Sequence, residues 1–384
     1  MLDFMAADRA RLSDLEMQIM HFERLLAPLR AEQARVQEKL NAYKYPVLTL
    51  PNEVTGEIFM CFLPAHPDAP PLTGPTSPTT LTQVCRQWRK VALATPMLWR
   101  AMLFLDDIPY AQTRCLSEAW IRRSVSCPLV IDVDIDDPEF LLEMFTAPLA
   151  MGTAQWERLR IRGSLSSLPK TASAMPMLRS LELVLAAFPS DFLAFYDTPQ
   201  LRTVLLHGDV ASKVTLPWIQ LTCLTLNYVW VNDCVQVLAQ TPNLVRCVVV
   251  VEGGPGPGGV TRVKLALPFL ESLVLKNTIR HPTLDGLDQF LDLFVVPALS
   301  SLDVEKIFLR VDPIAQFQLL VSTFGCGLQE VCIRGRIGTT YGNQFRQAFP
   351  SISTFSFPDA YEDETDEDEY EEDDSDSDYL DESE

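Results

Sequence analysis

Leu270-Glu271-Ser272-Leu273-Val274-Leu275 is one copy of a six-residue pattern, apolar-x-x-apolar-x-apolar, that recurs through the C-terminal part of the chain. Nine copies occur at intervals of 20 to 29 residues, beginning at Trp156, Leu178, Leu201, Leu221, Leu244, Leu270, Leu299, Leu328 and Ile352. The last two apolar positions lie two residues apart, which places both side chains on one face of a strand. A single unit cannot bury that face alone, so we expect the units to stack and share one core.

This repetition resembles the leucine-rich repeat in a degenerate form, because the asparagine turn of the typical repeat is missing. The resemblance implies an α/β multidomain chain in which residues 106–358 form an irregularly curved solenoid. Leu129–Ile135 alternates apolar and polar residues, and we expect it to be the first, capping strand of that solenoid. Helical patterns are expected in the outer layer at 233–240, 287–295 and 313–323.

Two blocks upstream of the repeats have the pattern of short helices. The first is Leu50-Pro51-Asn52-Glu53-Val54-Thr55-Gly56-Glu57-Ile58-Phe59, and the second runs from Leu81 to Ala92 and precedes Leu98-Trp99. Pro51 suits the first turn of a helix, where its missing N–H costs nothing. Val54 and Ile58 lie four residues apart and therefore share a helix face. Residues 63–80, between the blocks, hold six prolines and are expected to form an extended or disordered loop.

The two blocks resemble an F-box over residues 46–105, split by the insert at 63–80, and the split and the preceding helix are similar to the large F-box families of mushroom-forming fungi. In the F-box family this motif docks on the Skp-type linker subunit of a Skp–cullin–F-box ubiquitin ligase. The resemblance implies linker binding by Leu50, Pro51, Val54, Ile58, Phe59, Val84, Cys85 and Trp88. Trp88 is the strongest expected anchor, because a large aromatic side chain in a partner's pocket can contribute ~2 kcal/mol or more.

Residues 1–45 have the periodicity of a coiled-coil-like helix. From residue 9 onward, apolar residues alternate three and four positions apart, with Gln33 in one slot: Leu12, Leu15, Ile19, Phe22, Leu26, Leu29, Val36, Leu40 and Tyr43. Pro28 predicts two helical pieces with a kink, because proline removes a backbone donor and clashes with the preceding turn. Two uses remain open, namely a homodimer through residues 9–43 or packing of the helix on its own F-box region.

The charge of the chain is concentrated at one end. The formal net charge is −20, and residues 359–384 contain 17 Asp and Glu and no Lys or Arg. The rest has 34 acidic residues (51 minus 17) against 31 basic ones, or −3. We expect residues 359–384 to be a disordered acidic tail. The sequence shows no signal peptide, no apolar run long enough for a membrane and an odd count of nine cysteines, which predicts a nuclear or cytoplasmic protein that is not secreted.

Residues that alternate with the inward side chains of the repeats are candidates for binding a target. The candidate set is Arg158, Arg160, Arg162, His207, Asn227, Arg246 and Lys276. Later repeats add charges of both signs at Asp303, Glu305, Glu330 and Arg334. The three early arginines suit an acidic or phosphorylated target, because guanidinium groups form paired hydrogen bonds with oxyanions.

We interpret the chain as a receptor subunit that joins a linker to an unidentified target protein. One alternative is an interaction scaffold outside any ligase, dimerising through the N-terminal helix. A second is a histone-binding, chaperone-like or chromatin-associated protein driven by the acidic tail.

The remaining motifs do not indicate an enzyme, a metal site, a cofactor or nucleic-acid binding. Residues 254–259 fit G-x-G-x-x-G, but prolines occupy positions where N–H groups would hold phosphate. Asp132, Asp134, Asp136 and Glu143 have calcium-loop spacing, but Asp137 stands where that loop requires glycine.

Overall fold

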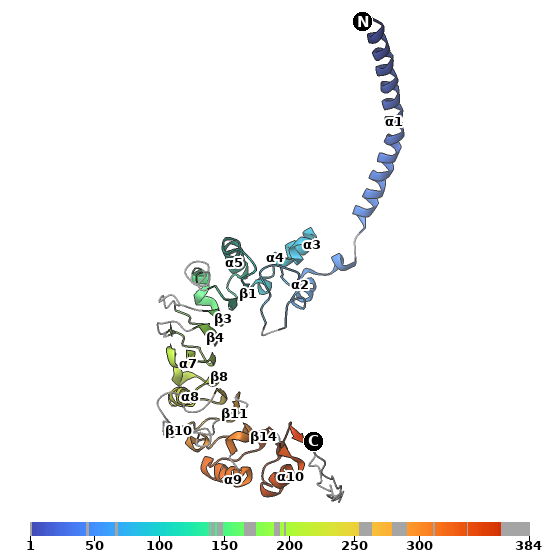
Figure 1. The fold of residues 1–384 in the computed structure, drawn as a ribbon. Coiled ribbons are helices and arrows are strands. Elements are labelled where there is room, and N and C mark those ends of the chain that lie inside the picture. The colour runs from blue at the N-terminus through green and yellow to red at the C-terminus, as the bar shows by residue number, and fades with distance from the viewer. Residues whose placement is uncertain are drawn as a thin grey trace, which may run out of the picture.

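A computed structural model of the chain describes residues 2–43, 46–65, 68–137, 139, 143, 149–164, 174–187, 193–195, 197–252, 263–278, 290–309, 312–335 and 337–361. The described part has a long N-terminal helix, a small helical region and a domain built on a parallel sheet (Figure 1). The acidic tail expected at 359–384 lies outside the described residues from residue 362 onward, as do the glycines of 254–259.

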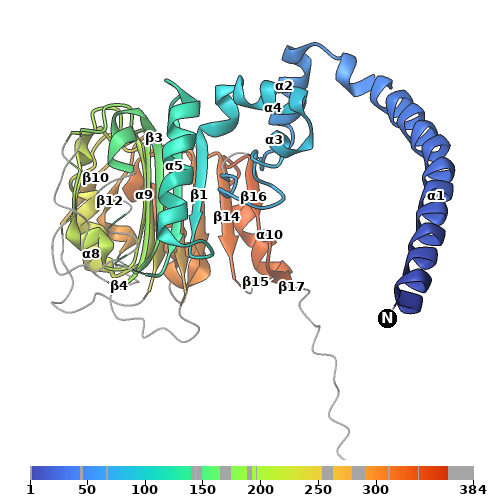
Figure 2. The same cartoon turned by 90° about the horizontal axis from the view of Figure 1, so that it is seen from above.

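The N-terminal segment is one helix, α1, at Leu2–Ala42, with Pro28 inside it. The prediction of two helical pieces with a kink is therefore wrong, because the helix is continuous through Pro28. Proline removes one backbone hydrogen bond, but the strong helix formers on both sides continue the helix, and its effect is limited to curvature. The helix is curved and extends away from the rest of the chain (Figure 2). Every side chain from Met5 to Tyr43 is exposed, so α1 does not pack on its own F-box region.

The region after α1 consists of short helices with locally determined ends. They are a 3-10 helix at Pro46–Thr49, α2 at Asn52–Met60, α3 at Leu81–Val84, α4 at Arg86–Leu93 and a 3-10 helix at Pro96–Trp99. Helix α4 begins where the Cys85 sulfur accepts a hydrogen bond from the Trp88 backbone N–H at 3.4 Å. Trp99 is fully buried, and its indole Nε1 donates to the Ala92 carbonyl at 2.9 Å. These bonds tie α4 to the turns on either side of it.

The proline-rich insert, described at residues 63–65 and 68–80, is a loop of bends and turns that packs on its neighbours. Ala69 and Leu72 are buried, and the Ser77 hydroxyl donates to the Leu72 carbonyl at 3.0 Å. The Pro70 carbonyl accepts a hydrogen bond of 2.9 Å from the Leu103 N–H. The expectation of an extended or disordered loop is therefore wrong over residues 72–80, which form bends and turns closed by hydrogen bonds such as that from the Ser77 N–H to the Gly74 carbonyl at 3.1 Å.

Eleven parallel strands form the main sheet in the described residues, and their order in the sheet follows the chain. They are β1 Ala101–Leu105, β2 Leu129–Ile135, β3 Trp156–Ser164, β4 Ser180–Ala187, β6 Thr203–His207, β8 Cys223–Val229, β9 Arg246–Val251, β11 Ser272–Asn277, β13 Ser301–Glu305, β14 Glu330–Arg334 and β16 Thr354–Ser356. Leu129–Ile135 is a strand, as predicted, but it is not the first. β1, from the end of the 46–105 segment, pairs with it and forms the edge.

Each copy of the repeated motif contributes one strand to this sheet, and equivalent residues stand opposite each other. Leu273 of β11 pairs with Cys247 of β9 and with Leu302 of β13. All three are buried, as are the residues two positions further along. The parallel pairing thus stacks the apolar positions into one continuous row, which is the shared core that the spacing predicts.

Helices and short strands form a second layer on the outer side of the arc of strands (Figure 1). The helices are α5 Tyr110–Ser124, α7 Val210–Lys213, α8 Val231–Leu238, α9 Pro313–Phe324 and α10 Thr339–Ala348, with 3-10 helices at Leu149–Gln155, Trp218–Gln220, Leu291–Leu293 and Lys306–Leu309. Two-stranded pairs join β5 Leu193–Ala194 to β7 Val214–Thr215, β10 Leu265–Ala266 to β12 Phe294–Val295, and β15 Ile337–Gly338 to β17 Ala360–Tyr361.

The helices expected at 233–240 and 313–323 correspond to α8 and α9. The helix expected at 287–295 is wrong over its described residues. They form a 3-10 turn at Leu291–Leu293 and the strand β12, because burial against the adjacent layer overrides a weak local pattern.

Gly163 is a position at which the sheet has no room for a side chain. Its φ is +132°, and a Cβ there would lie 1.9 Å from the Ile135 carbonyl oxygen of the neighbouring strand. We predict that Gly163→Ala lowers the free energy of unfolding by about 2–4 kcal/mol, because backbone must move in two strands. Gly327→Ala is the matched control, since no atom lies within 4 Å of its Cβ position. Urea unfolding of both variants tests this, and equal midpoints would contradict it.

Candidate protein-binding surfaces

The helical region exposes several large apolar side chains to solvent. Val54 and Ile58, one turn apart on α2, are 44% and 48% exposed, and Val84 at the end of α3 is 57% exposed. The other large apolar side chains exposed in this region are Val47, Phe62, Leu93 and Met97. We call Val54, Ile58 and Val84 the F-box apolar set. Exposed apolar groups of this size in a small helical region are typical of a surface that a partner covers.

The predicted linker-binding residues fall into two groups in the structure. Pro51 is exposed and Leu50 half-buried, and together with the F-box apolar set they can be reached by a partner. Phe59 is buried, and Cys85 and Trp88 are half-buried. The rings of Phe59 and Trp88 meet edge to face, with centroids 5.0 Å apart. Phe59 and Trp88 therefore hold α2 against α4.

Sequence reasoning missed Phe62, which follows Ile58 by four residues and continues the same stripe just beyond α2. That spacing is the signal by which it could have been found. Trp88 has a further feature, because its buried indole Nε1 has no hydrogen-bond partner among the described residues.

On the parallel sheet, alternate side chains point away from the core toward the inner side of the arc. We call this surface the inner face, and its middle row, in register across the strands, is Arg160, Glu182, Leu205, Thr225, Val248, Val274, Asp303, Cys332 and Ser356. The inner face as a whole carries all seven predicted target-binding residues, at the strand positions that alternate with the core-facing ones.

The three arginines of β3 are paired with carboxylates of the adjacent strands. Arg160 contacts Asp132 of β2 and Glu182 of β4, each at 2.9 Å, and its side chain is only 9% exposed. Arg158 lies 3.7 Å from Glu182. Arg162 lies 3.6 Å from Asp134. The expected basic patch is therefore neutralised by partners from neighbouring strands, a pairing fixed by register that the linear sequence does not display.

Burial and ion pairing shift the pKa values of Asp132 and Arg160 in opposite directions. Burial raises the pKa of Asp132 above its ordinary value, against the opposing effect of the Arg160 and Arg162 charges. Burial lowers the pKa of the Arg160 guanidinium, but the carboxylates of Asp132 and Glu182 outweigh that effect and leave the pKa raised. The arginine stays charged, and it compensates two partly desolvated acids.

We predict that Arg160→Met lowers the free energy of unfolding at neutral pH by about 3 kcal/mol, because it removes the 2.9 Å ion pair of the buried Asp132 and leaves Glu182 with longer contacts only. Arg162→Met is the control, with a more exposed ion pair and an expected loss below about 1 kcal/mol.

The loss in Arg160→Met should shrink as pH falls toward about 4. Without its cation, the buried Asp132 has a folded-state pKa raised further above the unfolded value, so the folded chain binds more protons and regains stability in acid. Chemical denaturation between neutral and acidic pH measures this, and a pH-independent loss would contradict it.

The centre of the inner face is apolar. Leu205, Val248 and Val274 of the middle row are each half-buried, between the ion pairs of β2–β4 and an Asp303–Arg334 pair at 2.8 Å. Reading the outward positions for charge alone misses these three residues. Aliphatic residues at the same outward-facing motif position, in β6 and, beyond Thr225 of β8, in β9 and β11, are the signal that could have found them.

The four remaining predicted target-binding residues surround this apolar centre. Arg246 is exposed at the start of β9, and Lys276 is half-buried near the end of β11. His207 pairs in register with Asn227, and its ring lies 4.7 Å from that of Tyr228.

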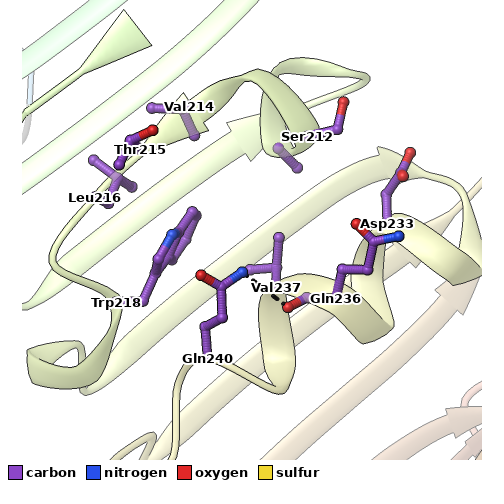
Figure 3. Close-up of a pocket in the computed structure, with 10 residues that line it drawn as sticks. Ser212, Val214, Thr215, Leu216, Trp218, Asp233, Gln236, Val237 and Gln240 are labelled. Carbon is purple, nitrogen blue, oxygen red and sulfur yellow. Dashed lines mark hydrogen bonds between the residues drawn. The ribbon is translucent and has the colours of Figure 1, made fainter. Parts of the chain in front are cut away.

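A hollow of about 250 Å³ lies on the outer layer beside α7 and α8 (Figure 3). Trp218 and Leu216 line the hollow on one side. Asp233, Gln236 and Gln240, from α8 and the turn that follows α8, line the other. The Gln240 amide donates to the Gln236 carbonyl at 3.1 Å. Burial, with the nearby charge of Asp209, raises the pKa of Asp233. The residues that line the hollow include one carboxyl group, on Asp233, and two hydroxyl groups, on Ser212 and Thr215, and the Ser212 hydroxyl donates to the Asp209 carbonyl at 2.9 Å.

Over the described ranges, no group of three or more His, Cys, Asp or Glu is arranged to hold a metal ion. None of the helices that the structure describes combines the length and the apolar character of a bilayer span.

Residues 47–105 match the F-box-like family model, which confirms the F-box prediction and covers the helical region through β1. None of the curated proteins matches the chain significantly. F-box domains bind Skp-type linkers and, through them, cullin complexes, and F-box proteins are typically adaptors without catalytic activity. The resemblances to leucine-rich repeats and to fungal families stay predictions. The chain contains an F-box-like domain at residues 47–105, which indicates an adaptor role in a Skp–cullin–F-box ubiquitin ligase complex.

Proposed function

We propose that the chain is the substrate-receptor subunit of a Skp–cullin–F-box ubiquitin ligase. In this proposal the F-box apolar set docks on the linker, and the parallel-sheet domain, as a leucine-rich-repeat-like solenoid, holds the target on its inner face. The observation that carries the proposal is that Val54, Ile58 and Val84 are exposed within the matched F-box-like domain.

Docking on the linker is supported by how the helices are built. Gly56 is buried, and a Cβ at that position would lie 3.5 Å from the Thr95 hydroxyl, so α2 closely approaches the turn after α4. The Phe59–Trp88 contact fixes the same pair of helices. With the inward side of α2 fixed in this way, Val54 and Ile58 are held outward, and covering the exposed half of each can contribute about 1 kcal/mol.

The inner face suits a target segment with an apolar centre and an acidic flank. Leu205, Val248 and Val274 would receive the apolar side chains. Arg246 and Lys276 carry the positive charge beside them, whereas Arg158, Arg160 and Arg162 are committed to internal carboxylates. In this proposal the acidic part of the target therefore contacts Arg246 of β9 and Lys276 of β11, and not the arginines of β3.

We predict that the double change Ile58→Asp and Val84→Asp weakens binding of a purified Skp-type linker by more than about 100-fold, because each desolvates a charge at the contact. Both side chains are exposed in the free chain, so the fold should be retained. Ile219→Asp is the matched control, since Ile219 is 66% exposed on the sheet domain. Isothermal titration calorimetry with the full chain provides the measurement.

Trp88→Ala provides a contrast. Because its ring packs on Phe59, we expect it to lower thermal stability together with linker affinity. Full linker binding by the Ile58→Asp, Val84→Asp chain would overturn the docking proposal, and no binding by the intact folded chain would favour the scaffold alternative.

A further inference from the structure

Helix α1 carries an apolar seam that the described chain leaves uncovered. Its 41 residues extend away from the F-box-like domain (Figures 1 and 2). The nine apolar residues of the seam, from Leu12 to Tyr43, are between 41% and 66% exposed. A single helix with this much exposed apolar surface is marginal in water, because helices of this kind derive most of their stability from packing.

The spacing of the seam indicates what covers it. Ten successive positions from 12 to 43 alternate three and four residues apart, which is the 3.5-residue period of two helices that supercoil around each other. Pro28 lies at the third position of its heptad when Leu26 is the first, on the outer flank of the helix and away from the seam. The proline therefore does not prevent a second helix from packing along the whole seam.

We propose that two copies of the chain pair through α1 as a parallel two-stranded coiled coil spanning residues 12–43. The inference does not depend on the proposed function, since α1 and the F-box apolar set are separate surfaces.

Gln33, the polar residue of the seam, favours the parallel orientation. In a parallel pair the two Gln33 side chains face each other at the first heptad position and can exchange amide hydrogen bonds. In an antiparallel pair with the same ends aligned, each Gln33 would face Phe22 and leave its amide unpaired. A matched polar layer fixes register and orientation at a cost in stability.

Flanking charges agree with the parallel pairing. Arg11 and Glu16 occupy the seventh and fifth positions of successive heptads, which meet across a parallel interface. Two such contacts form in a symmetric dimer. Three of the four equivalent later pairs hold at most one charge and are not repulsive, namely Gln18 with Glu23, Leu25 with Arg30 and Glu32 with Gln37. The fourth, Lys39 with Lys44 at the end of the seam, brings two cations together.

Sedimentation equilibrium of the full chain tests the pairing. We expect a mass of twice the 43.2 kDa of one chain. The double change Leu15→Asp and Leu26→Asp should raise the dimer dissociation constant by more than about 100-fold, since each layer loses two apolar side chains. Met17→Asp with Met20→Asp is the matched control, because both methionines are exposed on α1 but lie off the seam. A monomeric wild-type chain, or equal effects of the two double variants, would overturn the proposal.

A charge exchange tests the orientation. Arg11→Glu alone places two acids together at each contact and should weaken the dimer several-fold, and adding Glu16→Arg should restore it. Within one helix these residues are five apart and are not neighbours, so restoration reports a contact between chains. An unrestored double variant would overturn the parallel arrangement. Linker binding, measured in parallel, should be unchanged in every α1 variant, which separates failure of this inference from failure of the proposed function.

Discussion

The in-register stacking of apolar side chains through the parallel sheet is the constraint on which the rest of the structure depends. Leu224, Cys247, Leu273 and Leu302 stand opposite one another in four consecutive strands, and each is buried. Because every strand buries its motif against its neighbours, no unit is stable alone, and the core extends along the whole arc. The outer layer covers the core side of this row, and the side chains that alternate with the row form the inner face.

The F-box-like domain is joined to this core by shared packing. Its last element, β1, is also the first strand of the sheet, so the two parts have one backbone ladder in common. Trp99 lies edge to face with Trp120 of α5 at 5.3 Å, and the Arg123 guanidinium lies over the Trp99 ring at 4.5 Å. Because Trp99 and Trp120 are fully buried, a protein that bound the inner face as proposed would be held in a defined direction relative to one that bound α2.

Local periodicity and spacing in the sequence predict most strands, α8, α9, the long N-terminal helix and the F-box-like domain. The features that cannot be predicted are those that depend on which strands are neighbours. The pairing of Arg160 with Asp132 and Glu182 joins residues 28 and 22 positions away. The burial of Phe59 against Trp88 likewise depends on how two helices meet, which a helical pattern on each does not specify. β1 was missed as a strand because it has only five residues and lies at the end of the segment 46–105 that was interpreted as an F-box.

The contact of the proline-rich insert with β1 has a consequence for solubility. A parallel sheet of this length ends in a row of backbone groups that could pair with a strand of another molecule. Along β1, the Leu103 N–H is already bonded to Pro70, and Pro71, which forms an isolated bridge with Leu103, has no N–H to offer the next strand. At Leu103, in the middle of β1, two prolines of the loop therefore occupy the place where a strand of another molecule would pair, which opposes edge-to-edge growth at this end of the sheet.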